Sequence, residues 1–318
     1  MRAFITGVAG FIGSALADAL VARGDEVVGV DCFTPYYDRS TKEANLAGLR
    51  LNERFRLLEA DLRSDAIGDA LDGVDVVFHQ AAQPGVRLSW STGFAEYSSQ
   101  NVLATQRLLE AVKSIEHGRP RVVYASSSSV YGNAAVYPTR ERDLPQPHSP
   151  YGVTKLAAEH LCALYAANYG VDSVSLRYFT VYGPRQRPDM AMHRLLEAGL
   201  TGAAFPLYGD GSAVRDFTFV GDVVAANLAA ATADVAPGTV VNIAGGGSIA
   251  MSDLLELAGK VLGTEIMVDR QPAQPGDVDR TGGSIEVARS LLGWRPVVDV
   301  EQGLTEQAAW HRTRRGAT

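Results

Sequence analysis

The sequence predicts an α/β protein, built as a doubly wound parallel sheet with a smaller, discontinuous C-terminal lobe. Three observations support this fold class. Short apolar runs alternate with longer amphipathic stretches, a glycine-rich turn follows the first run, and 318 residues with 46% hydrophobic content suffice for a large core. Apolar runs of about four to six residues between helical patterns indicate buried parallel strands joined by crossover helices. These runs lie at residues 3–5, 26–30, 55–58, 74–78, 121–124, 173–178 and 239–243.

A glycine-rich turn separates the first predicted strand from a helix predicted over 11–22. Its spacing is Gly-x-x-Gly-x-x-Gly, and bare backbone at a helix N-terminus can approach the pyrophosphate of a dinucleotide. The alternative is that these glycines only permit tight packing of strand against helix. The cofactor contacts expected here are Gly7, Gly10, Phe11, Ile12 and Gly13.

The ends of the next strands supply further expected cofactor contacts. Asp31 closes the second strand, where a carboxylate accepts hydrogen bonds from both adenosine ribose hydroxyls. The same carboxylate would repel a 2′-phosphate, so NAD is predicted in preference to NADP. Asp61 and Leu62 follow the third strand and are expected near the adenine. Ala81 and Ala82 follow the fourth strand and are expected along the cofactor, with ordinary strand-end chemistry as the alternative for all four.

Tyr151 and Lys155 form the predicted catalytic pair. Positions four apart share one face of a helix, so both side chains are expected to point into the same cleft. A nearby ammonium lowers the pKa of a tyrosine from its reference of about 10, which makes the phenol a usable base near neutral pH. Lysine is scarce beside arginine in this chain, which argues against a chance lysine at this position. The pair indicates oxidation of an alcohol by a nicotinamide cofactor.

Four consecutive serines at 126–129 follow the strand predicted at 121–124. They are expected at the carboxyl edge of the sheet, within reach of the same substrate hydroxyl. Ser127 is the predicted third catalytic group. A turn or helix-capping role is the alternative, and it is preferred for the other three serines.

The second half of the chain contains loop-rich segments at 183–188, 209–211 and 271–276. They are predicted to build a cap over the carboxyl ends of the strands, where open α/β sheets bind ligands. Residues 1–179 with about 217–243 are therefore predicted to form an NAD-binding Rossmann domain. Residues of about 180–216 with 244–318 are predicted to form a nucleotide-sugar-binding lobe.

The motifs at 176–184, 215–217 and 275–277 resemble those of the extended short-chain dehydrogenase/reductases, in the nucleotide-sugar epimerase/dehydratase branch. The likeness covers essentially the whole chain. It implies that Tyr178 borders the nicotinamide, that Arg215 holds the nucleotide diphosphate and that Asp277 holds a uridine ribose.

Two further stretches, at 83–89 and 185–191, resemble UDP-glucuronate 4-epimerases, which invert C4 of a sugar with a C5 carboxylate. A guanidinium holds a carboxylate in two-point geometry, which makes Arg87 and Arg187 candidates for that contact. A salt bridge or a phosphate contact is the alternative for each. The expected substrate contacts are Arg87, Ser127, Ser128, Thr180, Arg187, Arg194, Arg215 and Asp277.

The resemblance implies an isomerase, in which the C4 hydroxyl is oxidised to a transient ketone and reduced again on the opposite face, with no net redox change. Ser128 and Ser129 stand where the 4,6-dehydratases of the family carry an acidic pair, so dehydration is not expected. Three alternatives remain open: a UDP-glucose or UDP-N-acetylglucosamine 4-epimerase, a UDP-glucuronate decarboxylase, and a non-catalytic NAD-binding regulator.

Composition narrows the partners and the compartment. A formal net charge of -7 argues against a nucleic-acid or anionic-membrane surface. The two cysteines lack metal-ligand spacing, so no metal is expected and a reducing, cytoplasmic compartment fits best. No apolar run approaches the roughly 20 residues that span a bilayer, and the N-terminus leaves no room for a signal peptide. A homodimer is expected by likeness, with helices around 101–113 and 150–169 pairing across a two-fold axis or, alternatively, facing the core.

Overall fold

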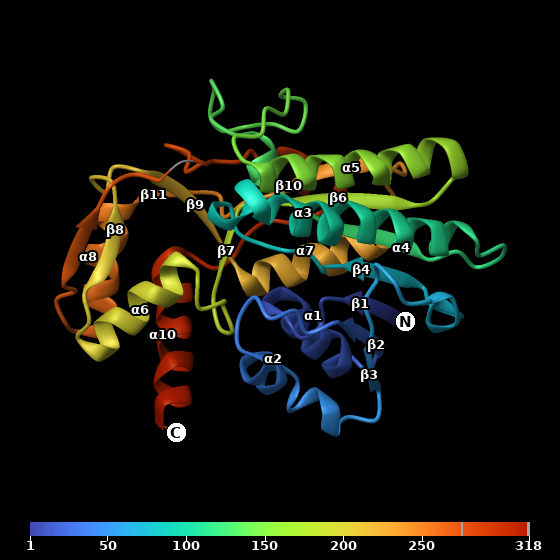
Figure 1. The fold of residues 1–318 in the computed structure, drawn as a ribbon, viewed down its shortest axis with the longest axis horizontal. Helices are drawn as coiled ribbons and strands as arrows, with labels where there is room; N and C mark the ends of the chain where they lie inside the picture. The colour runs from blue at the N-terminus through green and yellow to red at the C-terminus, as the bar shows by residue number, and fades with distance from the viewer. Residues whose placement is uncertain (275, 317–318) are drawn as a thin grey trace.

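The computed structural model describes residues 1–274 and 276–316, and a seven-stranded parallel sheet lies at its centre (Figure 1). The strand order is β10-β6-β5-β4-β1-β2-β3, and all the neighbouring pairs are parallel. This order confirms the doubly wound sheet. The strands are β1 (Arg2–Thr6), β2 (Glu26–Asp31), β3 (Phe55–Glu59), β4 (Val76–His79), β5 (Arg121–Ser127), β6 (Ser173–Tyr178) and β10 (Thr239–Ile243).

Helices cover both faces of this sheet. Successive strand residues point to opposite faces, and because they are apolar, both faces must be buried. Ala3 and Ile5 of β1 pack into the hydrophobic cluster that includes α1 and α7, whereas Phe4 packs into the cluster under α4 and α5. Strands buried on both faces therefore read as continuous apolar runs, as the sequence predicted. The four helices are α1 (Phe11–Ala22), α4 (Ala104–Lys113), α5 (Pro150–Tyr169) and α7 (Val220–Thr232).

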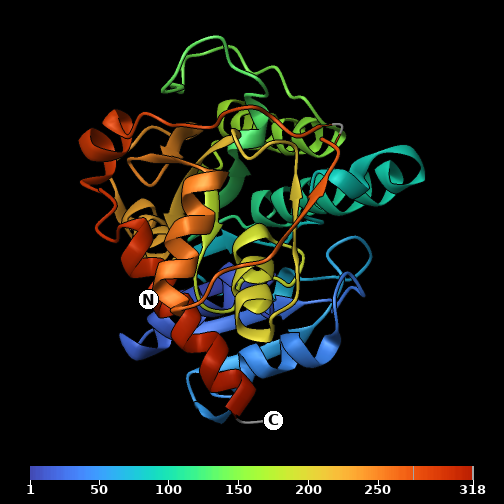
Figure 2. The same ribbon diagram turned by 90° about the vertical axis from the view of Figure 1, so that its left-hand side faces the viewer.

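A second lobe lies to one side of the sheet and contains two small sheets, ordered β11-β9-β7 and β12-β8 (Figure 1). The C-terminal helix α10 packs against α6 and α8 in this lobe (Figure 2). Its strands are β7 (Thr180–Tyr182), β8 (Phe205–Tyr208), β9 (Val214–Phe219), β11 (Ser248–Ala250) and β12 (Val268–Gln271), and its helices are α6 (Ala191–Thr201), α8 (Met251–Leu262) and α10 (Val300–Gly316).

The remaining helices are α2 (Arg39–Leu46), α3 (Phe94–Tyr97) and α9 (Glu286–Leu292). Just after α9, Trp294 donates an indole hydrogen bond to the Asp222 carbonyl on α7, at 2.9 Å, so the C-terminal segment also contacts the central domain. The domain boundaries stay a prediction. Pro275, the first residue of the 275–277 motif, lies outside the described residues. Within the described residues, no helix is long and apolar enough to cross a membrane.

Candidate active site

One pocket opens at the carboxyl ends of the central strands, as expected for an open α/β sheet. Residues from β1, β2, β5, β6, α1, α2, α4 and α5 border it, together with the loops that follow β2, β3 and β4 and Arg187 of the lobe. All the predicted cofactor contacts lie on its wall, namely Gly7, Gly10, Phe11, Ile12, Gly13, Asp31, Asp61, Leu62, Ala81, Ala82, Tyr151, Lys155 and Tyr178.

The turn between β1 and α1 requires glycine at two positions. Gly7 has φ +69°, and a Cβ built there would lie 2.8 Å from the Ala81 Cα. A Cβ on Gly13 would lie 2.3 Å from the Gly7 carbonyl oxygen. Bare backbone therefore faces the pocket at the N-terminus of α1, where a pyrophosphate binds favourably. The turn fits a dinucleotide.

Asp31 is held at the end of β2 by the main chain. Its Oδ2 accepts a hydrogen bond from the Ala9 amide at 3.1 Å, and its Oδ1 accepts from the Phe33 amide at 2.8 Å. Each carboxylate oxygen has more than one lone pair, so capacity remains for a ribose diol. The bare turn and this carboxylate together fit NAD.

Lys42 is a pocket residue that the sequence analysis missed. Asp38 caps α2 by accepting from the Ser40 amide at 2.7 Å, and this places Lys42 one turn into the helix. Its Nζ lies 3.4 Å from Asp31 Oδ1, with both side chains 7% exposed. Lysine is scarce in this chain, and this scarcity, which singled out Lys155, could also have singled out Lys42.

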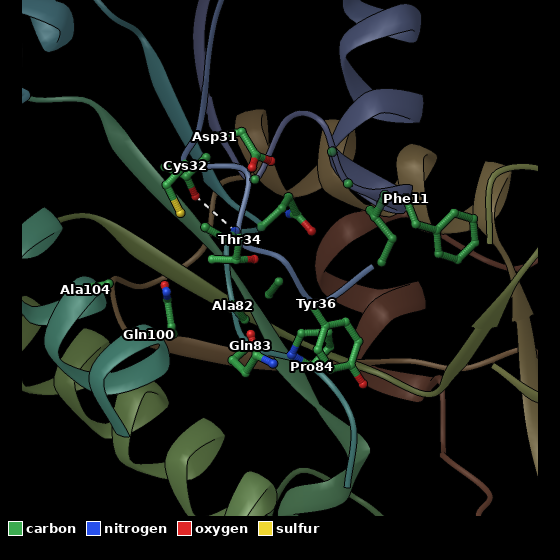
Figure 3. Close-up of a pocket in the computed structure, with 18 of the residues that line it drawn as sticks. Phe11, Asp31, Cys32, Thr34, Tyr36, Ala82, Gln83, Pro84, Gln100 and Ala104 are labelled. Carbon is green, nitrogen blue, oxygen red and sulfur yellow. Dashed lines mark hydrogen bonds between the residues drawn. The ribbon is translucent and has the colours of Figure 1, made fainter. Parts of the chain in front are cut away.

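Several uncharged residues on the pocket wall were also missed. Tyr36 lies on the segment after β2, Gln83 and Pro84 follow β4, and Gln100 precedes α4. Figure 3 shows Asp31 at one end of the pocket and Tyr36, Gln83 and Pro84 at the other. Gln83 and Pro84 lie in the stretch 83–89 that carries the family resemblance, whereas Tyr36 and Gln100 lie in no motif and reach the pocket through the packing of distant segments.

Tyr151 and Lys155 are placed by the start of α5. Ser149 caps this helix by accepting from the Gly152 amide at 3.1 Å, and Pro150 occupies the first helical position. Tyr151 therefore lies in the first turn and Lys155 one turn later, both on the pocket wall as predicted.

Burial dominates the electrostatics of this pair. It lowers the pKa of Lys155 to about 7, and the Nζ donates to the Ala125 carbonyl at 2.6 Å. Burial also raises the pKa of Tyr151, while a Ser127 hydrogen bond and the Arg187 charge oppose this shift. The direction is opposite to the lowering expected from the sequence, because desolvation of the phenolate outweighs the neighbouring positive charge in the protein alone.

The serines at the end of β5 differ in what they contact. Ser126 borders the pocket, but its hydroxyl donates to Glu159 at 2.7 Å. Ser127 Oγ instead accepts from the Ser129 amide at 3.1 Å, which leaves its proton free to donate to Tyr151. Ser128 begins the single turn that follows. This arrangement favours Ser127 as the hydroxyl that acts with Tyr151.

Arg187 reaches the same pocket from the lobe. Its Nε and Nη2 each donate to Asp189 at 3.0 Å. The guanidinium carbon lies 5.8 Å from the centre of the Tyr36 ring, and the Tyr36 hydroxyl donates to Asp189 at 3.3 Å. The Arg187 charge also acts on the pKa of Tyr151, so a cation lies near the predicted catalytic phenol.

Arg87 lies in a separate group with Asp277 and Arg215. Arg87 Nη2 donates to Asp277 at 2.8 Å, and its guanidinium stacks 3.9 Å from the centre of the Tyr208 ring. Arg215 Nη1 donates to the Val214 carbonyl at 3.0 Å, and the charges of Asp277 and Arg87 both act on its pKa, which burial lowers. Arg87 is not among the described residues that border the pocket, so the structure separates it from Arg187.

Of the predicted substrate contacts, only Arg187 borders the pocket in the described part of the chain. The others do not, namely Arg87, Ser127, Ser128, Thr180, Arg194, Arg215 and Asp277. Thr180 begins β7 and Arg194 lies on α6. On α6 and α10, the described residues also contain one cluster with metal-ligating atoms, in which His311 Nδ1 lies 2.6 Å from Glu197 and His193 lies nearby. These groups hydrogen-bond within the lobe and lie off the pocket wall.

The fold and the site define an α/β protein with a glycine-rich dinucleotide turn and with a tyrosine and a lysine on the wall of the same pocket. Residues 3–244 match the NAD dependent epimerase/dehydratase family, and the chain belongs to this family.

Three similar proteins cover nearly the whole chain. An uncharacterized UDP-glucose epimerase of Bacillus subtilis (strain 168) is 39% identical over 98% of this chain and 98% of its own length. A probable UDP-glucuronate 4-epimerase of Rhizobium meliloti (strain 1021) is 36% identical, covering 98% and 97%. The solved UDP-glucuronic acid 4-epimerase from Bacillus cereus, in complex with UDP-glucuronic acid and NAD, is 39% identical with a TM-score of 0.94, covering 99% and 100%.

Proposed function

We propose that this chain catalyses NAD-dependent C4 epimerisation of a UDP-sugar, converting UDP-glucuronate to UDP-galacturonate through a transient 4-keto intermediate. The observation that carries this proposal is the position of Arg187 in one pocket with Tyr151 and Lys155. Arg187 supplies a cation for a carboxylate, and Tyr151 and Lys155 supply the groups for oxidising an alcohol. The likeness to the Rhizobium meliloti and Bacillus cereus proteins supports the same activity.

The residues of the central domain divide the work. Gly7, Gly10 and Gly13 would hold the pyrophosphate of NAD and Asp31 its adenosine ribose. When bound, NAD supplies the acceptor for the C4 hydride and its return. Tyr151, as the phenolate, takes the C4 hydroxyl proton and becomes the neutral phenol, with Ser127 as hydrogen-bond donor to its oxygen. The charge of Lys155, when protonated, favours the phenolate.

Arg187 protects the intermediate from a side reaction. The 4-keto form of a glucuronate is a β-keto acid, which loses carbon dioxide when its C5–C6 bond aligns with the carbonyl π system. Nε and Nη2 of Arg187 donate hydrogen bonds to Asp189. Nη1 is therefore left to hold the sugar carboxylate near the carbonyl plane.

The group formed by Arg87, Arg215 and Asp277 suits the nucleotide end of the substrate. Two guanidinium groups match a diphosphate, and a carboxylate matches a ribose diol. Opening of the Arg87–Asp277 ion pair would free both groups for these contacts. Ser128, Thr180 and Arg194 are proposed to complete the substrate site.

The chain is further proposed to act as a homodimer in a reducing, cytoplasmic compartment. The free cysteines Cys32 and Cys162 support the reducing compartment. Exposed apolar side chains beside α4 and on α5, with Leu103 at 46% and Leu164 at 53%, suit a helix-pairing interface.

A 4-epimerase for a neutral UDP-hexose is the second candidate. Asp189 already neutralises Arg187, so a carboxylate is not needed to pair it. The likeness to a UDP-glucose epimerase of Bacillus subtilis favours the same candidate.

The deciding experiment incubates the purified protein with UDP-glucuronate, without added cofactor, and follows the products by NMR. UDP-galacturonate alone is the expected product, with resident NAD acting as a bound catalyst. A pentose product would instead indicate a decarboxylase. No reaction with UDP-glucuronate, but turnover of UDP-glucose, would favour the second candidate.

A further inference from the structure

The segment that carries Arg187 lies between β7 and α6 and contains neither helix nor strand. Contacts with neighbouring elements nonetheless fix the backbone conformation of this segment. Arg185 has φ +69°, a left-handed conformation that costs energy in a residue with a Cβ. Its guanidinium lies 2.6 Å from Asp18 on α1, which ties the segment to the central domain. Strain of this kind persists only where surrounding contacts over-determine the backbone.

Gln186, the residue directly before Arg187, supplies most of those contacts and is 1% exposed. Its side-chain Nε2 donates to the Val181 carbonyl at 2.9 Å, and its Oε1 accepts from the His193 amide at 2.8 Å. Its main-chain carbonyl lies 2.8 Å from His193 Nδ1. Its main-chain amide donates to the Gly183 carbonyl at 3.1 Å.

Gln307 on α10 closes this network from the C-terminal end of the chain and is fully buried. Its Nε2 donates to Gln186 Oε1 at 2.9 Å, and its Oε1 accepts from the Gly183 amide at 3.0 Å. One amide therefore links both ends of the four residues that lead to Arg187. A buried amide in a satisfied network is costly to disrupt, which makes the backbone rigid at that point.

We propose that Gln307 is a positioning residue, which acts through Gln186 to hold Arg187 against the sugar carboxylate and so suppresses decarboxylation of the intermediate. This inference rests on the proposed function. Gln307 lies outside the pocket wall and touches no reacting atom, so its effect is on the geometry of Arg187. The C-terminal helix thereby influences which product leaves the site.

The suppressed side reaction is defined by its electron balance. The C5–C6 bond breaks, carbon dioxide leaves, and the electron pair of that bond forms the enolate across C4 and C5. The enolate then takes a proton at C5, so that reduction at C4 yields a UDP-pentose. A guanidinium displaced from the carboxylate would let the C5–C6 bond rotate into alignment with the C4 carbonyl.

The test replaces Gln307 by methionine, which keeps chain length and approximate volume while removing both hydrogen bonds. The variant is incubated with UDP-glucuronate, and the ratio of UDP-pentose to UDP-galacturonate is measured by NMR. We expect at least a tenfold rise in this ratio and a higher KM for UDP-glucuronate, with bound NAD and UDP affinity unchanged. The matched control is Gln302→Met, on the same helix but exposed, with a wild-type ratio expected.

An unchanged product ratio in Gln307→Met would overturn the inference, even if total activity fell, because a purely structural role lowers both products together. If Gln307→Met is insoluble, Gln186→Met removes the same hydrogen bond from its other side, together with the bonds to Val181 and His193, and the same rise in the product ratio is expected. Failure of the wild-type protein to epimerise UDP-glucuronate would instead contradict the proposed function, so the two failures are distinguishable.

Discussion

At the scale of single residues, burial shifts the pKa values of the two predicted catalytic groups. Tyr151 and Lys155 have pKa values shifted toward their neutral forms, upward for the phenol and downward to about 7 for the amine. Both shifts arise mainly from desolvation, which penalises the charged form of either group. Burial therefore costs folding stability at both groups, and of the two only Lys155 has a pKa near neutrality.

Replacement of Lys155 by methionine should abolish turnover yet stabilise the fold. The unfolded chain, with a lysine pKa of about 10.4, binds more protons than the folded chain above pH 7, so wild-type stability rises with pH across that interval. Lys155→Met removes this dependence and adds about 1–4 kcal/mol near pH 7. Urea unfolding of dinucleotide-free protein at pH 7 and 9 measures the added stability and the lost pH dependence.

The control for this substitution is Lys260→Met, since Lys260 is 70% exposed and pairs with Glu301 on the surface. Its unfolding should follow the pH dependence of the wild type. A Lys155→Met variant that is less stable than wild type at both pH values would contradict the desolvation argument.

Arg187→Ala tests the residue that distinguishes a glucuronate site from a neutral-sugar site. Without the guanidinium, the 4-keto acid should lose carbon dioxide, so a UDP-pentose appears while UDP-galacturonate falls by about 10-fold or more. NMR of the products and trapping of released carbon dioxide measure the change. Arg289→Ala, on an exposed position of α9, is the control. An inert Arg187→Ala variant, or one that epimerises normally, would count against the carboxylate role.

At the scale of elements, the turn between β1 and α1 joins packing and cofactor binding in the same backbone atoms. Gly13 lets the first turn of α1 approach the Gly7 carbonyl, where any Cβ would overlap it at 2.3 Å. The same close approach exposes the backbone amides at the helix N-terminus to the pocket. A side chain at this position should therefore affect the helix and the cofactor together.

Gly13→Ala should lower stability by about 1–3 kcal/mol through overpacking and should yield protein without bound dinucleotide. Thermal unfolding and the ultraviolet absorbance of the acid extract measure the two changes. Gly48→Ala is the matched control, because nothing lies within 4 Å of a Cβ at that position. Retention of full dinucleotide content in Gly13→Ala would exclude the turn as the pyrophosphate site.

At the scale of the whole molecule, two helices present apolar side chains to solvent. Along α5, the buried residues include Lys155, Cys162 and Tyr165, and the opposite face carries Val153 and Leu164, which are 49% and 53% exposed. Exposed apolar side chains of this size suit contact with a partner helix. Helix pairing across a two-fold axis would cover them.

The paired substitution Leu103→Glu and Leu164→Glu should convert the proposed dimer to monomers, because carboxylates would become buried without partners in the interface. Sedimentation velocity at micromolar concentration measures the change. Val297→Glu is the control, since Val297 is 73% exposed on a C-terminal loop. A wild-type protein that sediments as a monomer would refute the dimer.

Features that depend on local pattern could be predicted from the amino-acid sequence. The period of apolar residues predicted the central strands, and the glycine spacing predicted α1 at 11–22, as observed. Strand ends and helix spacing also predicted the cofactor wall, because parallel strands bring their carboxyl ends to one edge. The interval between Tyr151 and Lys155 placed both side chains on one helical face.

Contacts between distant residues, and the pKa shifts that burial causes, could not be predicted from the sequence and depend on the folded chain. The tertiary structure brought Lys42 to Asp31, Arg187 to Tyr151 and Arg87 to Asp277, contacts that depend on long-range packing. It also reversed the expected pKa shift of Tyr151, because desolvation depends on how completely other segments cover the phenol. Sequence spacing reports which face a side chain occupies, whereas burial and partners arise from the folded chain as a whole.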